Sequence, residues 1–243
     1  MSGLDPVALQ VISGALRAAC EEMGAVLVRS AHSANIKERR DCSTALFDPA
    51  GEMVMQAEHI PVHLGAMPAA VAAVLDCDHE PGVSWVLNDP YAGGTHLPDI
   101  TVVTPAYTDA GELLGFAASR AHHADVGGRV PGSMPADSKT LDEEGVVISP
   151  RVLDDDAISE LAEQMRQPAQ RRADLRAQLA ANRVGGLRLG ELAEKVGLDQ
   201  LREATAAGAW ALTSDPSGAR TRTGTKAPPE AGTSGSARQR TTK

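Results

Sequence analysis

The chain has 243 residues and a formal net charge of −9. This length allows one large domain or two small ones with a buried core. Residues 211–243 carry a net charge of +4, so the first 210 residues carry −13. Such an acidic body argues against nucleic acid as the main partner, because phosphate binding requires a basic surface.

The three cysteines are scattered along the chain and show no CxxC spacing, which is typical of buried thiols in a reducing compartment. The N-terminal residues do not show the basic-then-apolar pattern of a signal peptide, and no apolar run approaches about 18 residues. We therefore expect a soluble, cytoplasmic protein that does not contact a membrane.

Residues 4–31 are predicted to form one long amphipathic helix, because apolar residues recur in this range at helical spacing. Asp5 can cap its start, and Pro6 suits its first turn. The polar segment 30–43 follows, and the sequence leaves two interpretations of it open. It is either a solvated connection or a loop whose charged residues, Lys37, Arg39 and Asp41, line a polar site.

Two strands are predicted at residues 44–47 and 52–57, joined by a strong turn signal at 48–51. His59 and His63 come next at a spacing of four, but Pro61 lies between them and no glutamate follows His59. This pattern does not match a zinc-protease helix. Taken singly, each histidine is more often a structural residue than a metal ligand.

A helix is predicted at residues 66–76 and a short apolar strand at 83–87. Two histidine–aspartate clusters follow, at 88–99 and 120–128. They flank two apolar, strand-like runs at 100–107 and 113–119. If these runs pair as a hairpin, the start of the first strand meets the end of the second, and the two clusters come together at that point.

The hairpin would place Asp99 close to His122, although 23 positions separate them in the sequence. Converging imidazole and carboxylate groups suit a divalent metal such as Zn, Mn or Fe. Adjacent residues of a strand face opposite sides, so one of His122 and His123 is expected to point towards the site. The sequence leaves open which of the two does so.

Beyond the clusters, residues 129–145 are predicted to form a loop facing the site, followed by a short strand at 146–149. Residues 154–204 have helical periodicity, with breaks expected at Pro168 and at Gly185-Gly186. The charged run 170–178 is interpreted as a face in contact with solvent or another subunit. We predict an α+β fold: a long N-terminal helix, mostly antiparallel strands that carry the metal site, and a C-terminal helical segment.

Two regions are expected along the chain. Residues 1–210 form the folded domain, and residues 211–243 form a disordered, low-complexity basic tail, because its Ser, Thr, Gly, Pro, Ala and Arg residues cannot bury enough apolar surface. Gly93-Gly94 lacks the GxxxxGK[ST] pattern of a phosphate-binding loop. Nucleotide binding by this chain is therefore not expected.

Several motifs, taken in their order along the chain, resemble the hydantoinase B/oxoprolinase family. This family contains the B subunit of ATP-dependent N-methylhydantoinases, the matching half of 5-oxoprolinase and the alpha subunit of acetone carboxylase. The motifs are IKER at 36–39 with Asp41 and Ser43, ALFD at 45–48, QAEHIPVHLGAM at 56–67, NDPYAGGTHLPD at 88–99 and RAHHADVGG at 120–128. Weaker similarity at 165–168 and 174–178 extends the resemblance over about residues 5–205.

The resemblance implies a metal-dependent subunit that works with a hydantoinase A-type partner, and it assigns ATP binding to that partner alone. Carried over by motif, the metal ligands are Asp99, His122 and Asp125, with Zn, Mn or Fe as the divalent ion. His96 and His123 are the next candidates.

The remaining candidate roles are catalysis and substrate binding. We assign Asp89, His96 and His123 to catalysis, with Asp89 as a carboxylate that orients an imidazole. Lys37 and Arg39 could bind a carboxylate or phosphate of the activated substrate.

Three functions compete. The first is hydrolysis of a small cyclic amide, such as hydantoin or 5-oxoproline, with ATP supplied through the partner. The second is a carboxylase of the acetone or acetophenone type, whose substrate is a ketone. The third is an inactive, truncated fragment, because family members are longer and the composition changes abruptly near residue 205. A frameshift would explain that change.

Overall fold

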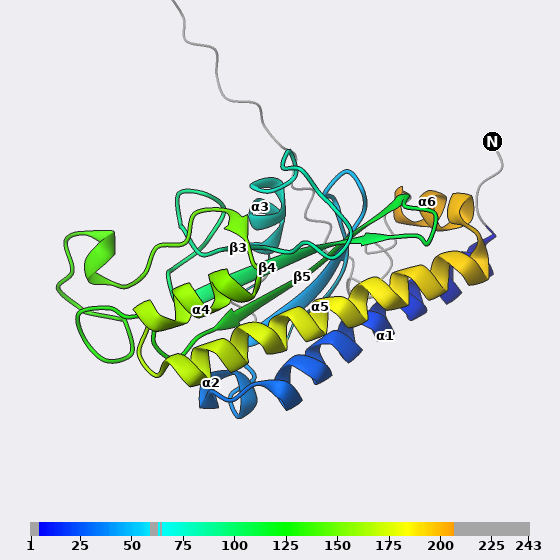
Figure 1. Cartoon of the computed structure of the whole chain (residues 1–243). Helices are drawn as coiled ribbons and strands as arrows, with labels where there is room; N and C mark the ends of the chain where they lie inside the picture. The colour runs from blue at the N-terminus through cyan, green and yellow to red at the C-terminus, as the bar shows by residue number, and fades with distance from the viewer. Residues whose placement is uncertain (1–4, 59–62, 64, 207–243) are drawn as a thin grey trace, which may run out of the picture. The chain divides into compact units, whose positions relative to one another are not determined.

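The structure is a computed structural model that describes residues 5–58, 63 and 65–206. The tail predicted at 211–243 lies outside the described residues, as does His59. In the described part, a long N-terminal helix leads into an antiparallel sheet, and helices follow at the C-terminal end (Figure 1). The predicted α+β fold is therefore confirmed.

The described strands form one six-stranded sheet in the order β2-β1-β5-β4-β3-β6, in which every neighbouring pair is antiparallel. Their bounds are β1 Cys42–Phe47, β2 Met53–Glu58, β3 Trp85–Leu87, β4 Asp99–Tyr107, β5 Leu113–His122 and β6 Arg151–Val152. The predicted hairpin is present as β4 and β5. Its register places Asp99 opposite His122 and Thr101 opposite Arg120.

The helices are α1 Pro6–Ser30, α2 Ala34–Lys37, α3 Met67–Ala72, α4 Asp155–Gln164, α5 Pro168–Val196 and α6 Leu198–Ala206. The side chain of Asp5 accepts a hydrogen bond from the Val7 amide, as expected of a cap. The predicted break at Pro168 is confirmed, because α5 begins there. Among the described helices, none combines the length and apolar character needed to cross a membrane.

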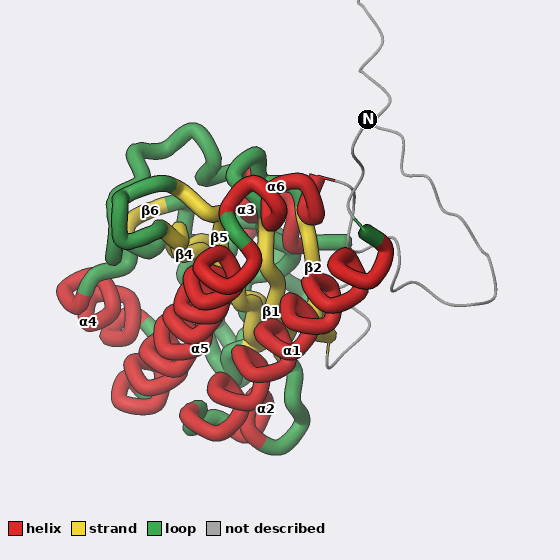
Figure 2. The backbone as a smooth tube through the Cα atoms, turned by 90° about the vertical axis from the view of Figure 1, so that its right-hand side faces the viewer, coloured by secondary structure: helices red, strands yellow, loops and turns green. Residues whose placement is uncertain are grey.

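Helices cover both faces of the sheet (Figures 1 and 2). α1 and α5 lie side by side along one face, which we call the α5 face, and α3 lies on the other, the α3 face. Alternate strand residues explain this division. Leu46 and Ala117 pack in a core with Leu16 of α1, whereas Phe47 and Phe116 pack in another with Met67 of α3.

The predicted helix break at Gly185-Gly186 is wrong, because α5 continues through both glycines to Val196. Close packing explains the glycine at 185. A Cβ on Gly185 would lie 2.5 Å from the Met23 sulfur and 2.9 Å from the Cβ of Ala117. The absence of a side chain therefore lets α5 approach both α1 and β5 closely.

The predicted strand at 146–149 is also wrong, because none of these four residues belongs to a strand. The segment is instead bonded to residues 88 and 89, which follow β3. The side chain of Asn88 takes the place of a strand partner. Its Oδ1 accepts a hydrogen bond from the Ile148 amide at 2.6 Å, and its Nδ2 donates to the Val146 carbonyl at 2.9 Å. The short strand β6 follows at Arg151–Val152.

The charged run at 170–178 is predicted to contact solvent or another subunit, and this is wrong for one side of the helix, which is buried within the chain. Arg171, Asp174, Gln178 and Asn182 are buried and lie three or four residues apart, so they share one face of α5. Arg172 and Arg176 lie on the other side of the helix and pair with acidic residues of α4, Glu163 and Asp155. The buried four form a polar layer between α5 and the sheet.

Side-chain amides of α5 bind carbonyl groups of the sheet directly. Gln178 Nε2 donates to the Ile100 carbonyl of β4 at 3.0 Å and the Ser119 carbonyl of β5 at 3.1 Å. Asn182 Nδ2 donates to the Val102 carbonyl at 2.9 Å. These bonds satisfy carbonyl groups that the covering helix would otherwise remove from water.

Asp174 links the same layer to the connection between α1 and α2. Its Oδ1 accepts hydrogen bonds from the amides of His32 at 2.7 Å and Ser33 at 3.1 Å. Its other oxygen lies 3.1 Å from the guanidinium of Arg171. These bonds to a buried carboxylate fix the backbone of residues 32 and 33, which connect α1 to α2 ahead of β1.

We expect substitution of Gly185 by alanine to destabilise the protein by about 1–3 kcal/mol, because the new methyl group forces Met23 and Ala117 apart. Gly190→Ala is the matched control in the same helix, since no atom lies within 4 Å of its added Cβ. That change should stabilise the helix by about 0.5–1 kcal/mol. Urea unfolding of both variants measures the difference, and equal effects would contradict the packing argument.

His123 makes stability depend on pH in a predictable direction. It is fully buried on the α5 face, with Nε2 3.0 Å from Gln178 Oε1, and burial lowers its pKa to about 4. Between that value and the unfolded value near 6.5, the unfolded chain binds a proton that the folded chain does not. Stability is therefore lost as the pH falls through this window.

Between pH 7 and pH 4, we expect the metal-free wild type to lose roughly 3 kcal/mol more unfolding free energy than His123→Gln does. Urea unfolding of both proteins at several pH values measures this difference. Parallel pH profiles would show that His123 does not titrate as its burial requires.

Candidate metal centre

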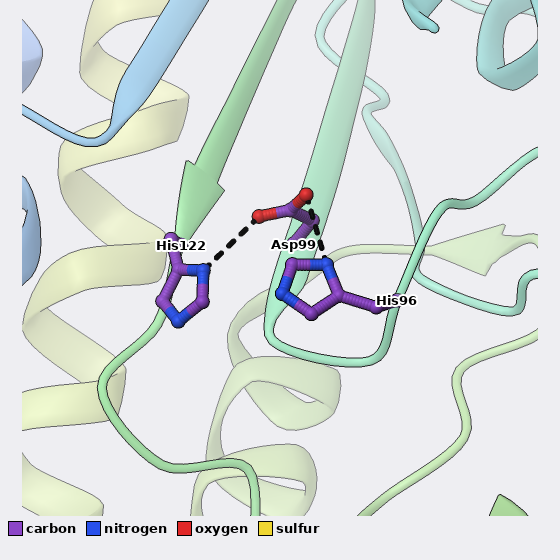
Figure 3. Close-up of side chains that lie close together, drawn as sticks. All are labelled: His96, Asp99 and His122. Atoms are coloured by element: carbon purple, nitrogen blue, oxygen red, sulfur yellow. Dashed lines mark ion pairs between the residues drawn. The ribbon is translucent and has the colours of Figure 1, made fainter. Parts of the chain in front are cut away.

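Three of the predicted site residues come together where the β4–β5 hairpin opens (Figure 3). One nitrogen of His96, one carboxylate oxygen of Asp99 and one nitrogen of His122 all lie within 4.8 Å of one another. The Asp99 carboxylate lies between the two rings, whose centroids are 5.0 Å apart. We call these three residues the central group.

The hairpin register and a tight turn position the central group. Asp99 begins β4 directly opposite His122, the last residue of β5. His96 precedes Asp99 by one turn, and the Asp99 amide donates to the His96 carbonyl at 3.0 Å. Thr95 Oγ1 donates to Asp99 Oδ2 at 2.9 Å and fixes the carboxylate.

The central group is strongly coupled electrostatically. Asp99 Oδ2 lies 3.0 Å from His96 Nδ1, and Oδ1 lies 3.4 Å from His122 Nδ1. Burial by itself would raise the pKa of Asp99, but the imidazoles of His122, His63 and His96 close to its carboxylate outweigh burial and hold the pKa well below its usual range. The bond to Asp99 raises the pKa of His96.

Two further residues, Asp41 and His63, surround the central group. His63 Nε2 lies 3.5 Å from Asp99 Oδ1 and 3.8 Å from Asp41 Oδ1, and Asp41 Oδ2 lies 3.8 Å from His122 Nδ1. Ser43 Oγ lies 3.0 Å from His63 Nδ1 and orients that ring. His63 and His122 thus approach both carboxylates at distances longer than a typical hydrogen bond.

These atoms suit a divalent metal. Asp99 Oδ1, Asp41 Oδ1 and His63 Nε2 are buried and have no hydrogen-bond partner among the described residues. Buried polar atoms are normally satisfied, so such a cluster is consistent with a missing common partner. A mixed set of imidazole nitrogens and carboxylate oxygens matches the ligand preferences of Zn, Mn and Fe.

His123 and Asp125 lie apart from the central group. The His123 ring points to the α5 face, so the choice left open by the sequence falls on His122. The Asp125 carboxylate accepts from the Gly132 amide, from Ser133 Oγ and from Arg166. Burial raises the pKa of Asp125, but these bonds together lower it. In this arrangement Asp125 organises a loop.

Asp89, Lys37 and Arg39 also lie outside the central group. Asp89 accepts from the Tyr91 amide at 2.9 Å and lies 3.3 Å from Ser149 Oγ, which places it in the turn that follows β3. Lys37 and Arg39 are exposed. Of that polar segment, it is Asp41 that reaches the site.

Sequence reasoning underrated Asp41 and His63. Asp41 immediately precedes β1, and its carbonyl accepts a hydrogen bond from the His122 amide at 3.0 Å. The pairing of β1 with β5 creates this contact, and local sequence patterns do not reveal it. A signal existed for both residues, because Asp41 belongs to the first family motif, beside IKER at 36–39, and His63 lies within the QAEHIPVHLGAM motif.

Arg120 was not singled out by the sequence. It is fully buried on the α3 face, two residues before His122 in β5. Burial lowers its pKa, whereas the nearby charge of Asp99 raises it. The repeated apolar and small residues around it predicted a strand, but nothing local indicated that the arginine points into the interior.

Comparisons with known proteins relate the chain to one protein family. A family model described as hydantoinase B/oxoprolinase matches residues 5–209. The chain is 43% identical over 205 residues to 5-oxoprolinase of Dictyostelium discoideum, covering 81% of this chain and 16% of that protein. It is 35% identical over 211 residues to caprolactamase subunit beta of Pseudomonas jessenii, covering 83% and 36%.

Two solved structures also match the chain. The crystal structure of ATP-dependent caprolactamase from Pseudomonas jessenii matches with a TM-score of 0.77 and 35% identity, covering 84% of this chain and 37% of that chain. A nucleotide-free acetone carboxylase also matches with a TM-score of 0.77, over 84% and 28% of the two chains. At 22% identity, that second match shows the fold alone.

The chain therefore spans less than two fifths of the length of each of these relatives. The family match nevertheless covers most of the chain and includes every motif from residue 36 to residue 128. On this basis, the chain belongs to the hydantoinase B/oxoprolinase family.

Proposed function

We propose that this chain carries the metal centre of an ATP-dependent enzyme that hydrolyses small cyclic amides. The observation that carries the proposal is the convergence of His96, Asp99 and His122, with Asp41 and His63 beside them, at the open end of the hairpin. ATP would be bound by a hydantoinase A-type partner, since the sequence shows no phosphate-binding loop.

The relatives favour a cyclic amide over a ketone as substrate. Identities of 43% to a 5-oxoprolinase and 35% to a caprolactamase subunit support the first choice. The likeness to acetone carboxylase, at 22% identity, concerns the fold and supports no choice of substrate. We therefore rank hydrolysis above carboxylation, while the inactive fragment stays open as the third alternative.

The central group would hold the metal through two imidazoles and one carboxylate, which leaves other coordination positions for water or substrate. When bound, the divalent ion would polarise a carbonyl group or make hydroxide available near neutral pH. Asp99 stays ionised because three imidazoles surround its carboxylate, so it is ready to act as a ligand.

The surrounding residues would keep the ligands oriented. Ser43 holds the His63 ring, and Asp41 approaches both His63 and His122. The His122 and His123 amides bind the carbonyls of Asp41 and Pro98, which ties both flanking segments to the end of β5. Outer contacts of this kind usually affect metal affinity by roughly 10–100-fold.

Metal analysis tests the ligand assignment. The purified chain should hold about one tightly bound Zn, Mn or Fe ion, and Asp99→Asn should lose it, because the variant replaces the bridging carboxylate by a neutral amide. Asp89→Asn is the matched control and should retain the metal. Asp125→Asn separates the geometric assignment from the motif-based one, and we expect it to retain the metal as well.

Two results would contradict this assignment. One is loss of metal in Asp125→Asn together with retention in Asp99→Asn. The other is a well-folded wild type that binds no divalent metal at all. Circular dichroism of each variant establishes that it is folded before its metal content is compared.

Activity should appear when the chain is combined with an ATP-binding partner of this family. We expect ATP-dependent opening of 5-oxoproline or caprolactam, reduced by about two orders of magnitude or more in Asp99→Asn. Consumption of acetone with bicarbonate would instead support the carboxylase alternative. Metal binding without turnover of either substrate class would support the inactive fragment.

A further inference from the structure

Arg120 carries a buried positive charge close to the central group. Its side chain is fully buried on the α3 face. Nε donates to Thr101 Oγ1 at 2.8 Å, and Nη2 lies 3.4 Å from the Gly93 carbonyl. These two bonds hold the guanidinium between β4, which carries Thr101, and the loop that contains Gly93 and leads to His96.

This guanidinium is incompletely paired. Among the described residues, no carboxylate oxygen lies within 4.0 Å of it, and Nη1 has no hydrogen-bond partner. The other fully buried arginine, Arg171, shows the usual solution, because Asp174 lies 3.1 Å from it. Burying a charge without a counterion is costly, so an unpaired arginine points to an anion that arrives from outside the chain.

The position of Arg120 relates it to the metal ligands. Arg120 and His122 are two residues apart on β5 and face the same side, so their backbones are separated by about 7 Å. Their partners across the hairpin, Thr101 and Asp99, repeat this spacing. The side chains of Arg120 and of the central group therefore project from the same face of the sheet, so a ligand bound at the central group could extend towards the guanidinium.

Charge balance favours the same conclusion. The carboxylates of Asp41 and Asp99 contribute two negative charges, and Arg120 contributes one positive charge. A divalent ion would leave an excess of one positive charge in a largely buried site. One bound monoanion would neutralise it, and a guanidinium nitrogen with free N–H groups is well suited to bind an oxyanion.

We propose that Arg120 binds an oxyanion of the substrate, a carboxylate or a phosphoryl group, while the central group holds the metal next to the reacting carbonyl. This inference rests on the proposed function and adds an anionic substrate class to it. It moves the anion-binding role from the exposed Lys37 and Arg39 to the interior. Binding requires the guanidinium to shift locally. The contact between Nη2 and the Gly93 carbonyl, at 3.4 Å, is the longer of its two hydrogen bonds and is the one we expect to break.

Titration of inorganic phosphate and of acetate into the metal-loaded chain tests the proposal. Wild type should bind at least one of them, and Arg120→Gln should bind it about tenfold or more weakly while keeping its metal. Arg120→Lys should be intermediate, because it retains the charge but offers a single nitrogen. Arg202→Gln, at an exposed arginine of α6, is the control and should bind as wild type does.

The two probes distinguish the sources of the oxyanion. Tighter binding of phosphate indicates a phosphoryl group, and tighter binding of acetate indicates a carboxylate. Equal affinity of the wild type and Arg120→Gln for both probes would overturn the proposal. Loss of metal from a folded Arg120→Gln would also overturn it, because Arg120 would then support the metal centre and not the substrate.

A crystallographic measurement on the wild type covers the case in which Arg120 variants fail to fold. Crystals of the metal-loaded chain soaked in selenate should show an anomalous peak within hydrogen-bond distance of Arg120 Nη1. Selenate bound elsewhere, or not at all, would overturn the inference. If the wild type binds no metal, the proposed function fails first, whereas metal binding without anion binding defeats this inference alone.

Discussion

The pairing of β4 with β5 holds the candidate site together, because it fixes Asp99 opposite His122. Neither strand carries the site alone, since one supplies the carboxylate and the other an imidazole. The same pairing brings the chain before β4 into position, because the His123 amide binds the Pro98 carbonyl. A local backbone register thus determines the distances among side chains that are remote in the sequence.

Much of this arrangement could be predicted from the sequence. Two apolar, strand-like runs flanked by histidine–aspartate clusters indicated the hairpin, and the hairpin implied that Asp99 meets His122. The contribution of Asp41 could not be predicted in the same way, because it depends on β1 pairing with β5 across more than 70 residues. Non-local pairings of this kind leave no periodic signal in either strand.

The polar face of α5 shows a second limit of sequence reasoning. Charged residues in a helix usually face solvent, and Arg172 and Arg176 follow that rule. Arg171 and Asp174 break it because each satisfies the other and both bind backbone groups. The helical spacing of 171, 174, 178 and 182 is present in the sequence, but the polarity of the run 170–178 predicted contact with solvent or another subunit.

The buried arginine of β5 has a consequence for how the chain finds its register. A slip of β5 by one residue exchanges the faces of all its side chains. His123 would then replace His122 opposite Asp99. Because a histidine faces Asp99 in both cases, this position does little to favour the native alignment over the slipped one. Arg120, however, would move to the α5 face, where the carboxylate of Asp174 is already paired with Arg171. The charge that leaves Nη1 free for a ligand also makes the misaligned sheet costly, so it selects a single native alignment.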